Sequence, residues 1–267
     1  MLEILQYSFM QNALIAGVLI AAICSILGVF LVLRRMSLMG DGLAHISFGG
    51  LAAGFFFGIY PLLAALVFSV LAAIGIQKLK AMKVHGDAAI AIFFSFGLAL
   101  GVVLISLSKG FSVDLFSYLF GSILAVGPGD LLFIAVLGVA TIAAIWAFYK
   151  ELFYITFDED SAKASGIQVE RMNAVLMVLT AMAVVVSMRI VGILLVSSFI
   201  VIPASIALLI CKNFKQAILL SVAIGVASAI VGLLASYYLD IAAGGAIVLT
   251  LVAVFFLVLA GQAIKKK

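Results

Sequence analysis

Two ionisable side chains, Asp41 and His45, stand in the otherwise apolar and glycine-rich stretch GDGLAHISFGG. On a helix, residues four apart share one face and lie about 5–6 Å from each other. Counting from Arg35 at about 1.5 Å per residue, Asp41 lies roughly 9 Å and His45 roughly 15 Å along that helix. Ionisable residues inside a membrane-spanning helix are costly and indicate a functional site by default.

A carboxylate and an imidazole on one face favour a first-row transition metal, because calcium and magnesium prefer shells made of oxygen alone. If two copies of the chain met at a two-fold axis, two Asp41 and two His45 would supply enough ligands for a tetrahedral zinc site. Manganese would need more oxygen ligands, so the pair slightly favours zinc. In the alternative interpretation, His45 bonds a backbone carbonyl and Asp41 caps the helix start. Four glycines would allow close helix approach at such an axis: Gly40, Gly42, Gly49 and Gly50.

The elements that position this pair are expected to be membrane-spanning helices. The chain has 267 residues, of which 67% are hydrophobic and only 10% charged, and its mean hydropathy is +1.43. That composition excludes a soluble domain and a nucleic-acid-binding protein, and predicts an all-α polytopic transmembrane bundle. Nine ranges could cross the membrane: 12–33, 38–58, 61–77, 87–107, 128–149, 172–187, 190–210, 215–237 and 243–263. Eight spans with one broken helix is the alternative, and residues 111–127 are too polar to span.

The distribution of positive charge predicts the orientation, since cytoplasmic loops carry an excess of lysine and arginine. With the N-terminus outside, only Lys109 and Arg189 of the 15 basic residues face outward. The others fall inside: Arg34, Arg35, Lys78, Lys80, Lys83, Lys150, Lys163, Arg171, Lys212, Lys215, Lys265, Lys266 and Lys267. The expected topology is therefore N-out and C-in.

One inner connection, 150–171, is rich in charge and must lie in water. Its segment from Asp158 to Ser165 has acidic residues at the front and Gly166 where a helix C-cap would sit, which predicts a short amphipathic helix on the cytoplasmic face. Ala162 and Gly166 would leave a small-residue surface open to a partner. A plain solvated loop is the alternative.

This loop resembles the coupling loop of ABC-transporter permeases, in which a short cytoplasmic helix fits a groove on the ATPase subunit. Four stretches resemble the branch that imports zinc, manganese or iron: RRMSLMGDGLAHISFGG at 34–50, YLFGSILAVGPGDL at 118–131, VGILLVSSFIVIPASIAL at 191–208 and SYYLDIAAGGAIVL at 236–249. The resemblance covers nearly the whole chain. It implies a single permease domain over 1–267 that works as a pair of identical or similar chains.

The resemblance also implies two further partners. A separate ATPase would dock at Asp158, Ala162 and Gly166, since the chain has no G-x-x-x-x-G-K-[ST] motif of its own. An extracytoplasmic metal-binding protein would deliver the cation. For that protein we expect an outer docking rim that contains Asp114 and Asp240 together with Lys109, Asp130 and Arg189. A rim that is merely solvated is the alternative.

Three further features of the sequence have less specific interpretations. Pro203 interrupts VSSFIVIPASIAL and would be either a hinge or a static kink, with Ser197, Ser198 and Ser205 able to bond the freed carbonyl. His85 is expected to be a solvated residue at the membrane interface. Cys24 is expected to be a small buried apolar side chain.

The expected function is therefore that of a multi-pass cell-membrane permease subunit that passes zinc to the cytoplasm along Asp41 and His45. Zinc, manganese or iron would be cargo, and no cofactor is expected. The alternatives are a manganese or iron importer of the same type, or an ion-coupled secondary carrier. A secondary carrier should show inverted repeats, which are not evident. An intramembrane hydrolase is excluded because no HExxH-type motif occurs.

Overall fold

The computed structural model describes residues 6–108, 113–122, 124 and 126–265, and within these ranges the regular structure is entirely helical. The elements are α1 (Ser8–Leu33), α2 (Met39–Phe57), α3 (Pro61–Ala81), α4 (Gly86–Leu107), α5 (Val113–Phe120), α6 (Pro128–Ala147), α7 (Tyr149–Phe157), α8 (Glu159–Ala164), α9 (Val169–Ser187), α10 (Val196–Ile210), α11 (Phe214–Leu239) and α12 (Ala243–Lys265). The predicted all-α class is confirmed.

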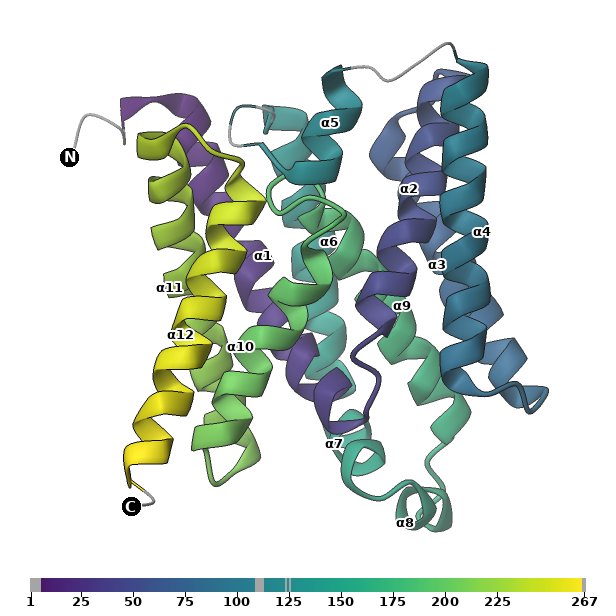
Figure 1. The fold of residues 1–267 in the computed structure, drawn as a ribbon. Coiled ribbons are helices and arrows are strands. Elements are labelled where there is room, and N and C mark those ends of the chain that lie inside the picture. Colours follow the sequence, from purple (N-terminus) through teal and green to yellow (C-terminus); the bar gives the residue numbers. More distant parts are fainter. Residues whose placement is uncertain (1–5, 109–112, 123, 125, 266–267) are drawn as a thin grey trace.

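The long helices form an elongated bundle, in which α1 begins at one end and α12 finishes at the other (Figure 1). In the described residues, seven helices are long and apolar enough to cross a membrane: α1, α3, α4, α6, α9, α11 and α12. Each of the nine predicted ranges overlaps a helix, but α2 and α10 are not among those seven. Asp41 and His45 lower the hydropathy of α2, and α10 is short. Nine crossings and the N-out orientation stay predictions.

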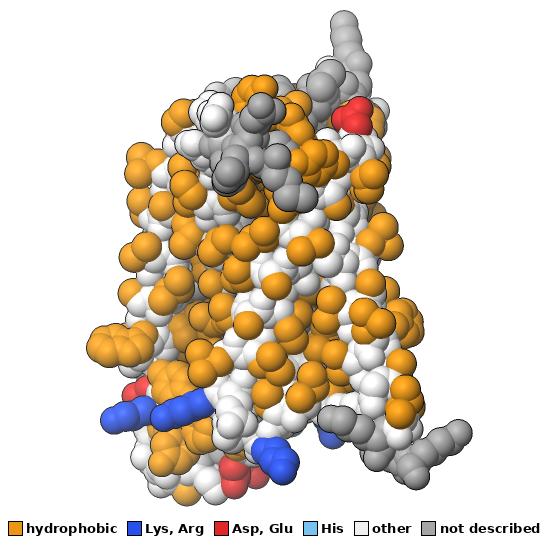
Figure 2. Space-filling view, turned by 90° about the vertical axis from the view of Figure 1, so that its left-hand side faces the viewer, with side chains coloured by type: hydrophobic (Ala, Val, Ile, Leu, Met, Phe, Trp, Pro, Cys, Tyr) orange, Lys and Arg blue, Asp and Glu red, His pale blue; other side chains and the backbone are white. Residues whose placement is uncertain are grey.

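Burial separates central helices from peripheral ones. In their most apolar windows, α1 is 67% and α9 is 61% buried inside the chain, whereas α4 is only 22% buried. The apolar side chains of α4, α6 and α12 therefore face outward, as expected where lipid replaces protein as the neighbour. On the face seen in Figure 2, hydrophobic side chains cover the middle, and the lysines and arginines lie at the lower end.

The connection between α9 and α10 differs from the prediction. The sequence predicts a span that starts at residue 190, but α10 begins at Val196, and residues 188–195 form turns inside the bundle. Backbone polar groups away from water need partners within the protein. The region around α5 supplies them, because Ile193 N donates to Tyr118 O (2.9 Å) and Ser122 N donates to Arg189 O (3.0 Å).

Arg189 and Asp130 are largely buried and do not form part of an exposed outer docking rim, contrary to the prediction. Arg189 Nη2 lies 3.1 Å from Asp130 Oδ2, and the two side chains are only 16% and 8% exposed. The Tyr60 hydroxyl donates to Asp130 Oδ1 at 2.8 Å, and the Arg189 guanidinium lies over the ring of Tyr118. The ion pair, the tyrosine hydrogen bond and the stacked guanidinium therefore connect the starts of α3 and α6, the helix α5 and the 188–195 turn.

Candidate functional site

Asp41 and His45 lie on the same face of one helix, as the sequence predicts. Asp41 is in the first turn of α2, His45 is one turn further on, and both are partly buried. Helix α2 packs against α3, α4, α9 and α10.

The glycines around this pair pack against helices of the same chain, which corrects the prediction that they lie at a two-fold axis. A Cβ atom built on Gly49 would lie 2.6 Å from the carbonyl oxygen of Gly97 in α4, and one on Gly50 would lie 2.9 Å from Ala65 Cα in α3. Gly42 meets Ile90 of α4, and Gly40 meets α10. The absence of side chains therefore allows α2 to be enclosed by its own neighbours.

The carboxylate of Asp41 faces α10. Ser197 Oγ donates a hydrogen bond to Asp41 Oδ1 at 2.9 Å. The two residues line a cleft of about 250 Å³ between the first turns of α2 and α10, together with Ser37, Leu38 and Ser198. Asp41 is thus held by a side chain 156 positions away, and a local cap of its own helix does not explain its orientation.

His45 lies apart from this cleft. Its ring is 4.1 Å from that of Phe94 in α4, measured between centroids, and His45 is not among the residues that line the cleft. Across the described part of the chain, no group of three or more histidine, cysteine, aspartate or glutamate residues is arranged to hold a metal ion. A cation at Asp41 would therefore need hydroxyls, water or a second chain to complete its ligands.

The predicted cytoplasmic helix is present as α8. Asp158 is its N-cap and accepts hydrogen bonds from the backbone N–H groups of Asp160 (3.1 Å) and Ser161 (3.0 Å), and the Ser161 hydroxyl donates to it at 2.6 Å. The bonds from Ser161 lower the pKa of the Asp158 carboxyl below its ordinary value. Gly166, with φ of +82°, ends the helix in a Schellman arrangement, in which Gly166 N donates to Lys163 O and Ile167 N to Ala162 O.

Ala162 does not present a surface to a partner, contrary to the prediction. Its side chain is fully buried, because α8 folds back against α7 and α9. The exposed side of α8 is made of other residues: Glu159, Asp160, Ser161, Lys163 and Ala164, followed by Ser165 and Gly166. A docking partner would meet these residues.

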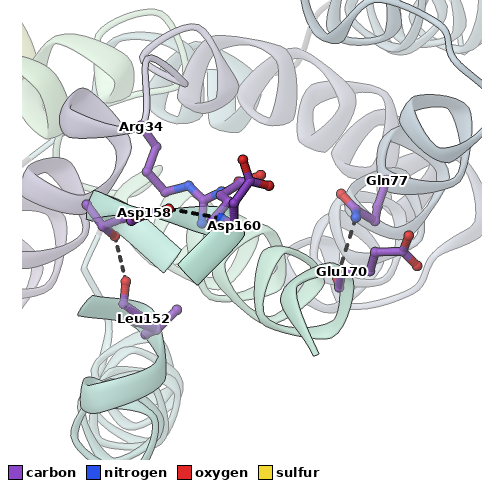
Figure 3. A network of polar contacts seen from close by, with 8 residues as sticks. Arg34, Gln77, Leu152, Asp158, Asp160 and Glu170 are labelled. Carbon is purple, nitrogen blue, oxygen red and sulfur yellow. Dashed lines mark hydrogen bonds and ion pairs between the residues drawn. The ribbon is translucent and has the colours of Figure 1, made fainter. Parts of the chain in front are cut away.

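Helix α8 is joined to the start of the α1–α2 connection by an ion pair between Arg34 and Glu159. The Arg34 side chain, only 6% exposed, reaches toward the start of α8 beside Asp158 and Asp160 (Figure 3). Burial lowers the pKa of the Arg34 guanidinium, and the nearby Glu159 carboxylate opposes that shift. The connection that follows Arg34 leads within a few residues to Asp41.

The remaining candidates lie apart from this region. Asp240 is exposed after the end of α11 and lines a separate cavity with Tyr237 and Ser122. Asp114 belongs to α5, but its side chain, like the whole of Lys109, lies outside the described residues. His85 is exposed just before α4, as expected. The Sγ atom of buried Cys24 lies 3.1 Å from the hydroxyl of Ser187.

Sequence reasoning missed two contacts, Ser197 with Asp41 and Arg34 with Glu159. Ser197 stands out in the sequence only as one of the serines near Pro203, and Arg34 only as one of the cytoplasmic basic residues. Both contacts join segments more than 100 positions apart. No spacing rule within one helix could reveal them.

Known proteins resemble this chain over nearly its full length. A model of the ABC 3 transport family matches residues 6–262. The chain is 36% identical over 255 residues to the manganese transport system membrane protein MntC of Listeria monocytogenes, covering 95% of this chain and 91% of that protein. It is 39% identical over 250 residues to the manganese import system permease protein ScaB of Streptococcus gordonii, with 93% and 90% covered.

Among solved structures, the chain resembles one from PsaBC of Streptococcus pneumoniae in complex with Fab. The TM-score is 0.86 and the sequence identity 38%, with 96% of this chain and 92% of that chain covered.

Proposed function

The chain belongs to the ABC 3 transport family and is the permease subunit of a metal importer, and from that premise we propose that it carries manganese through the membrane along Asp41 and His45. It is a multi-pass membrane protein and not an enzyme, and in such systems the ATPase is a separate subunit. Manganese replaces zinc as the favoured cargo because both relatives described above bear manganese in their names.

The main observation in support of a cation site is the position of the Asp41 carboxylate in its cleft beside Ser197. Carboxylate and hydroxyl oxygens are hard ligands and suit manganese better than a site of nitrogen and sulfur atoms would. Zinc prefers four-coordinate sites that include nitrogen or sulfur ligands. His45, one turn further along α2, would receive the cation after Asp41 or before it along the same face.

The exposed side of α8 is the proposed docking surface for the ATPase. Its cap at Asp158 and its turn at Gly166 make it a short, well-defined element, and buried Ala162 anchors it to the rest of the chain. The Arg34–Glu159 ion pair would transmit a displacement of α8 to the connection that precedes Asp41. The energy of ATP hydrolysis would then reach the cation site mechanically.

The proposed assembly has three further parts. A second permease copy would pair with this chain, and its Asp41 and His45 would face the pathway from the other side. An extracytoplasmic metal-binding protein would deliver the cation to the outer face near Asp114 and Asp240. The chain would cross the membrane nine times as one permease domain, with the N-terminus outside, the C-terminus inside and the 150–171 loop in the cytoplasm.

The cargo can be tested by competition. The permease is reconstituted in vesicles with its ATPase and binding protein, and ATP-dependent uptake is measured with manganese, zinc and iron at equal free concentration. We expect manganese to be transported fastest and to inhibit uptake of the other two. Faster transport of zinc, with no competition from manganese, would refute the manganese assignment while leaving the family assignment intact.

A further inference from the structure

The cleft at Asp41 contains more oxygen atoms than the carboxylate alone. Ser37 precedes α2, and Ser197 and Ser198 belong to the first turn of α10, so three hydroxyl-bearing residues line the cleft together with one aspartate. The rest of the lining is apolar: Leu38, Val201 and Ile202. A small apolar cleft with a few convergent oxygen atoms is the general form of a small-ligand site.

The close approach of α2 and α10 brings these oxygen atoms together. A Cβ atom built on Gly40 would lie 3.5 Å from Ser197 Cα and 3.3 Å from Ile200 Cδ1. The two helix starts therefore lie in van der Waals contact at Gly40. Because Asp41 follows directly, its carboxylate comes within hydrogen-bonding distance of the Ser197 hydroxyl.

We propose that Ser197 is a ligand for the transported cation and determines the preference for manganese over zinc. The proposal rests on the proposed function, because it takes Asp41 as part of the pathway. Without a cation, the Ser197 hydroxyl donates to the carboxylate and satisfies a partly buried charge. A hydroxyl oxygen also has two lone pairs, so rotation about its Cβ–Oγ bond turns it from a donor to Asp41 into an oxygen ligand for a metal bound there.

The oxygen ligands of this cleft would distinguish manganese from zinc. Ser197 adds a hard oxygen atom to that of Asp41, and Ser198 lies in the same cleft. Each added oxygen atom suits manganese, which accepts large oxygen-rich shells, more than zinc, which favours four ligands with nitrogen or sulfur among them. The same serine that keeps the carboxylate satisfied would thus raise the site's relative affinity for manganese.

The test compares four variants of the reconstituted importer: Ser197→Ala, Ser197→Thr, Ser197→Cys and, as the control on the same helix, Ser205→Ala, whose hydroxyl does not line the cleft. Uptake of manganese and zinc is measured over a range of concentrations to separate KM from the maximal rate. We expect Ser197→Ala to raise KM for manganese by about 10–100-fold, the usual loss when a group supporting a metal site is removed. Ser197→Thr should retain most of the activity, and Ser197→Cys should shift the preference toward zinc.

Asp41→Asn, measured in parallel, separates failure of this inference from failure of the proposed function. If Asp41→Asn abolishes uptake while Ser197→Ala and Ser197→Cys keep the parental KM and metal preference, Ser197 is not a ligand, and Asp41 remains in the pathway. If none of the three variants changes uptake, both the ligand role and the pathway at Asp41 are wrong. Equal losses in Ser197→Ala and Ser205→Ala would show a general weakening of α10 and overturn the inference.

Discussion

Arg34, at the end of α1, forms an ion pair with Glu159 in the first turn of α8, across 125 positions of sequence. The arginine side chain is nearly buried, whereas the glutamate is 46% exposed. Loss of the glutamate would leave a buried guanidinium without its counter-charge, which costs more than the loss of an exposed ion pair. The pair therefore ties the proposed ATPase-docking helix to the segment that leads into α2.

Breaking this pair should uncouple ATP hydrolysis from transport. We expect Glu159→Gln to weaken the attachment of α8 by about 1–3 kcal/mol, between the values for exposed and buried pairs. Metal uptake per ATP hydrolysed should fall several-fold, while the permease remains in the membrane. Asp160→Asn is the matched control, since Asp160 lies in the same turn and forms no ion pair among the described residues. An unchanged ratio of uptake to ATP hydrolysis in Glu159→Gln would remove Arg34 and Glu159 from the coupling route.

Substitutions at two alanines of α8 should distinguish an effect on ATPase docking from an effect on folding. Ala162 is buried and Ala164 is exposed. Ala164→Arg should place a bulky charge on the docking surface, so that the ATPase no longer co-purifies while the thermal stability of the permease is retained. Ala162→Arg should lower the thermal stability itself, because a charge would be forced into a packed interior. If Ala164→Arg binds the ATPase as the parent does, the exposed side of α8 is not the docking surface.

The cap of α8 should remain in place throughout the physiological pH range. Hydrogen bonds lower the pKa of Asp158 in the folded loop, so the stabilisation is present above the pKa of the unfolded chain and is lost only as the pH falls through the lowered folded value. Asp158→Ala should weaken ATPase association, whereas Asp158→Asn should preserve it, because asparagine is an equally good N-cap. Co-purification of the ATPase between pH 6 and pH 8 measures both the pH dependence and the effect of the two variants. If Asp158→Asn loses as much ATPase as Asp158→Ala, the charge of Asp158 is needed and the cap alone is not enough.

The crossing of α2 and α4 should tolerate no added methyl group. A Cβ atom on Gly97 would lie 2.4 Å from Ile46 Cα and 2.7 Å from the carbonyl oxygen of His45. We expect Gly97→Ala to destabilise the permease by about 1–3 kcal/mol, as overpacking usually does. Thermal unfolding in detergent checks this, with Gly245→Ala as the control, since a Cβ atom there meets nothing within 4 Å. Equal melting temperatures for the two variants would show that α2 and α4 are not packed as described.

Local sequence features predicted the helices well, because a helix depends on its own composition and on capping residues next to it in the sequence. The nine apolar ranges, and the short helix that starts after Asp158 and ends before Gly166, are examples. The errors arose where contacts between distant segments decide the outcome. Residues 188–195 leave the helix because α5 supplies partners for their backbone, and Ala162 is buried because α8 folds against α7. Neither contact has a signature in the sequence around it.

In the candidate site too, local sequence predicted some features, and contacts between distant segments decided the others. The helical spacing of Asp41 and His45 fixes their common face, so sequence was enough to pair them. Their different surroundings, Ser197 beside Asp41 and Phe94 beside His45, come from α10 and α4. The glycines were expected at a two-fold axis, since a small residue shows that something approaches closely but not which helix does so.

The most direct test of the central claim is manganese uptake by Asp41→Asn in the fully assembled importer. Asparagine preserves the size of the side chain and can still accept a hydrogen bond from Ser197, but it lacks the negative charge that offsets a divalent cation in a region of low dielectric constant. The account predicts that ATP-dependent manganese uptake is lost while the ATPase still co-purifies and the melting temperature stays close to the parent's. Manganese uptake at the parental rate in Asp41→Asn would contradict a cation pathway through Asp41.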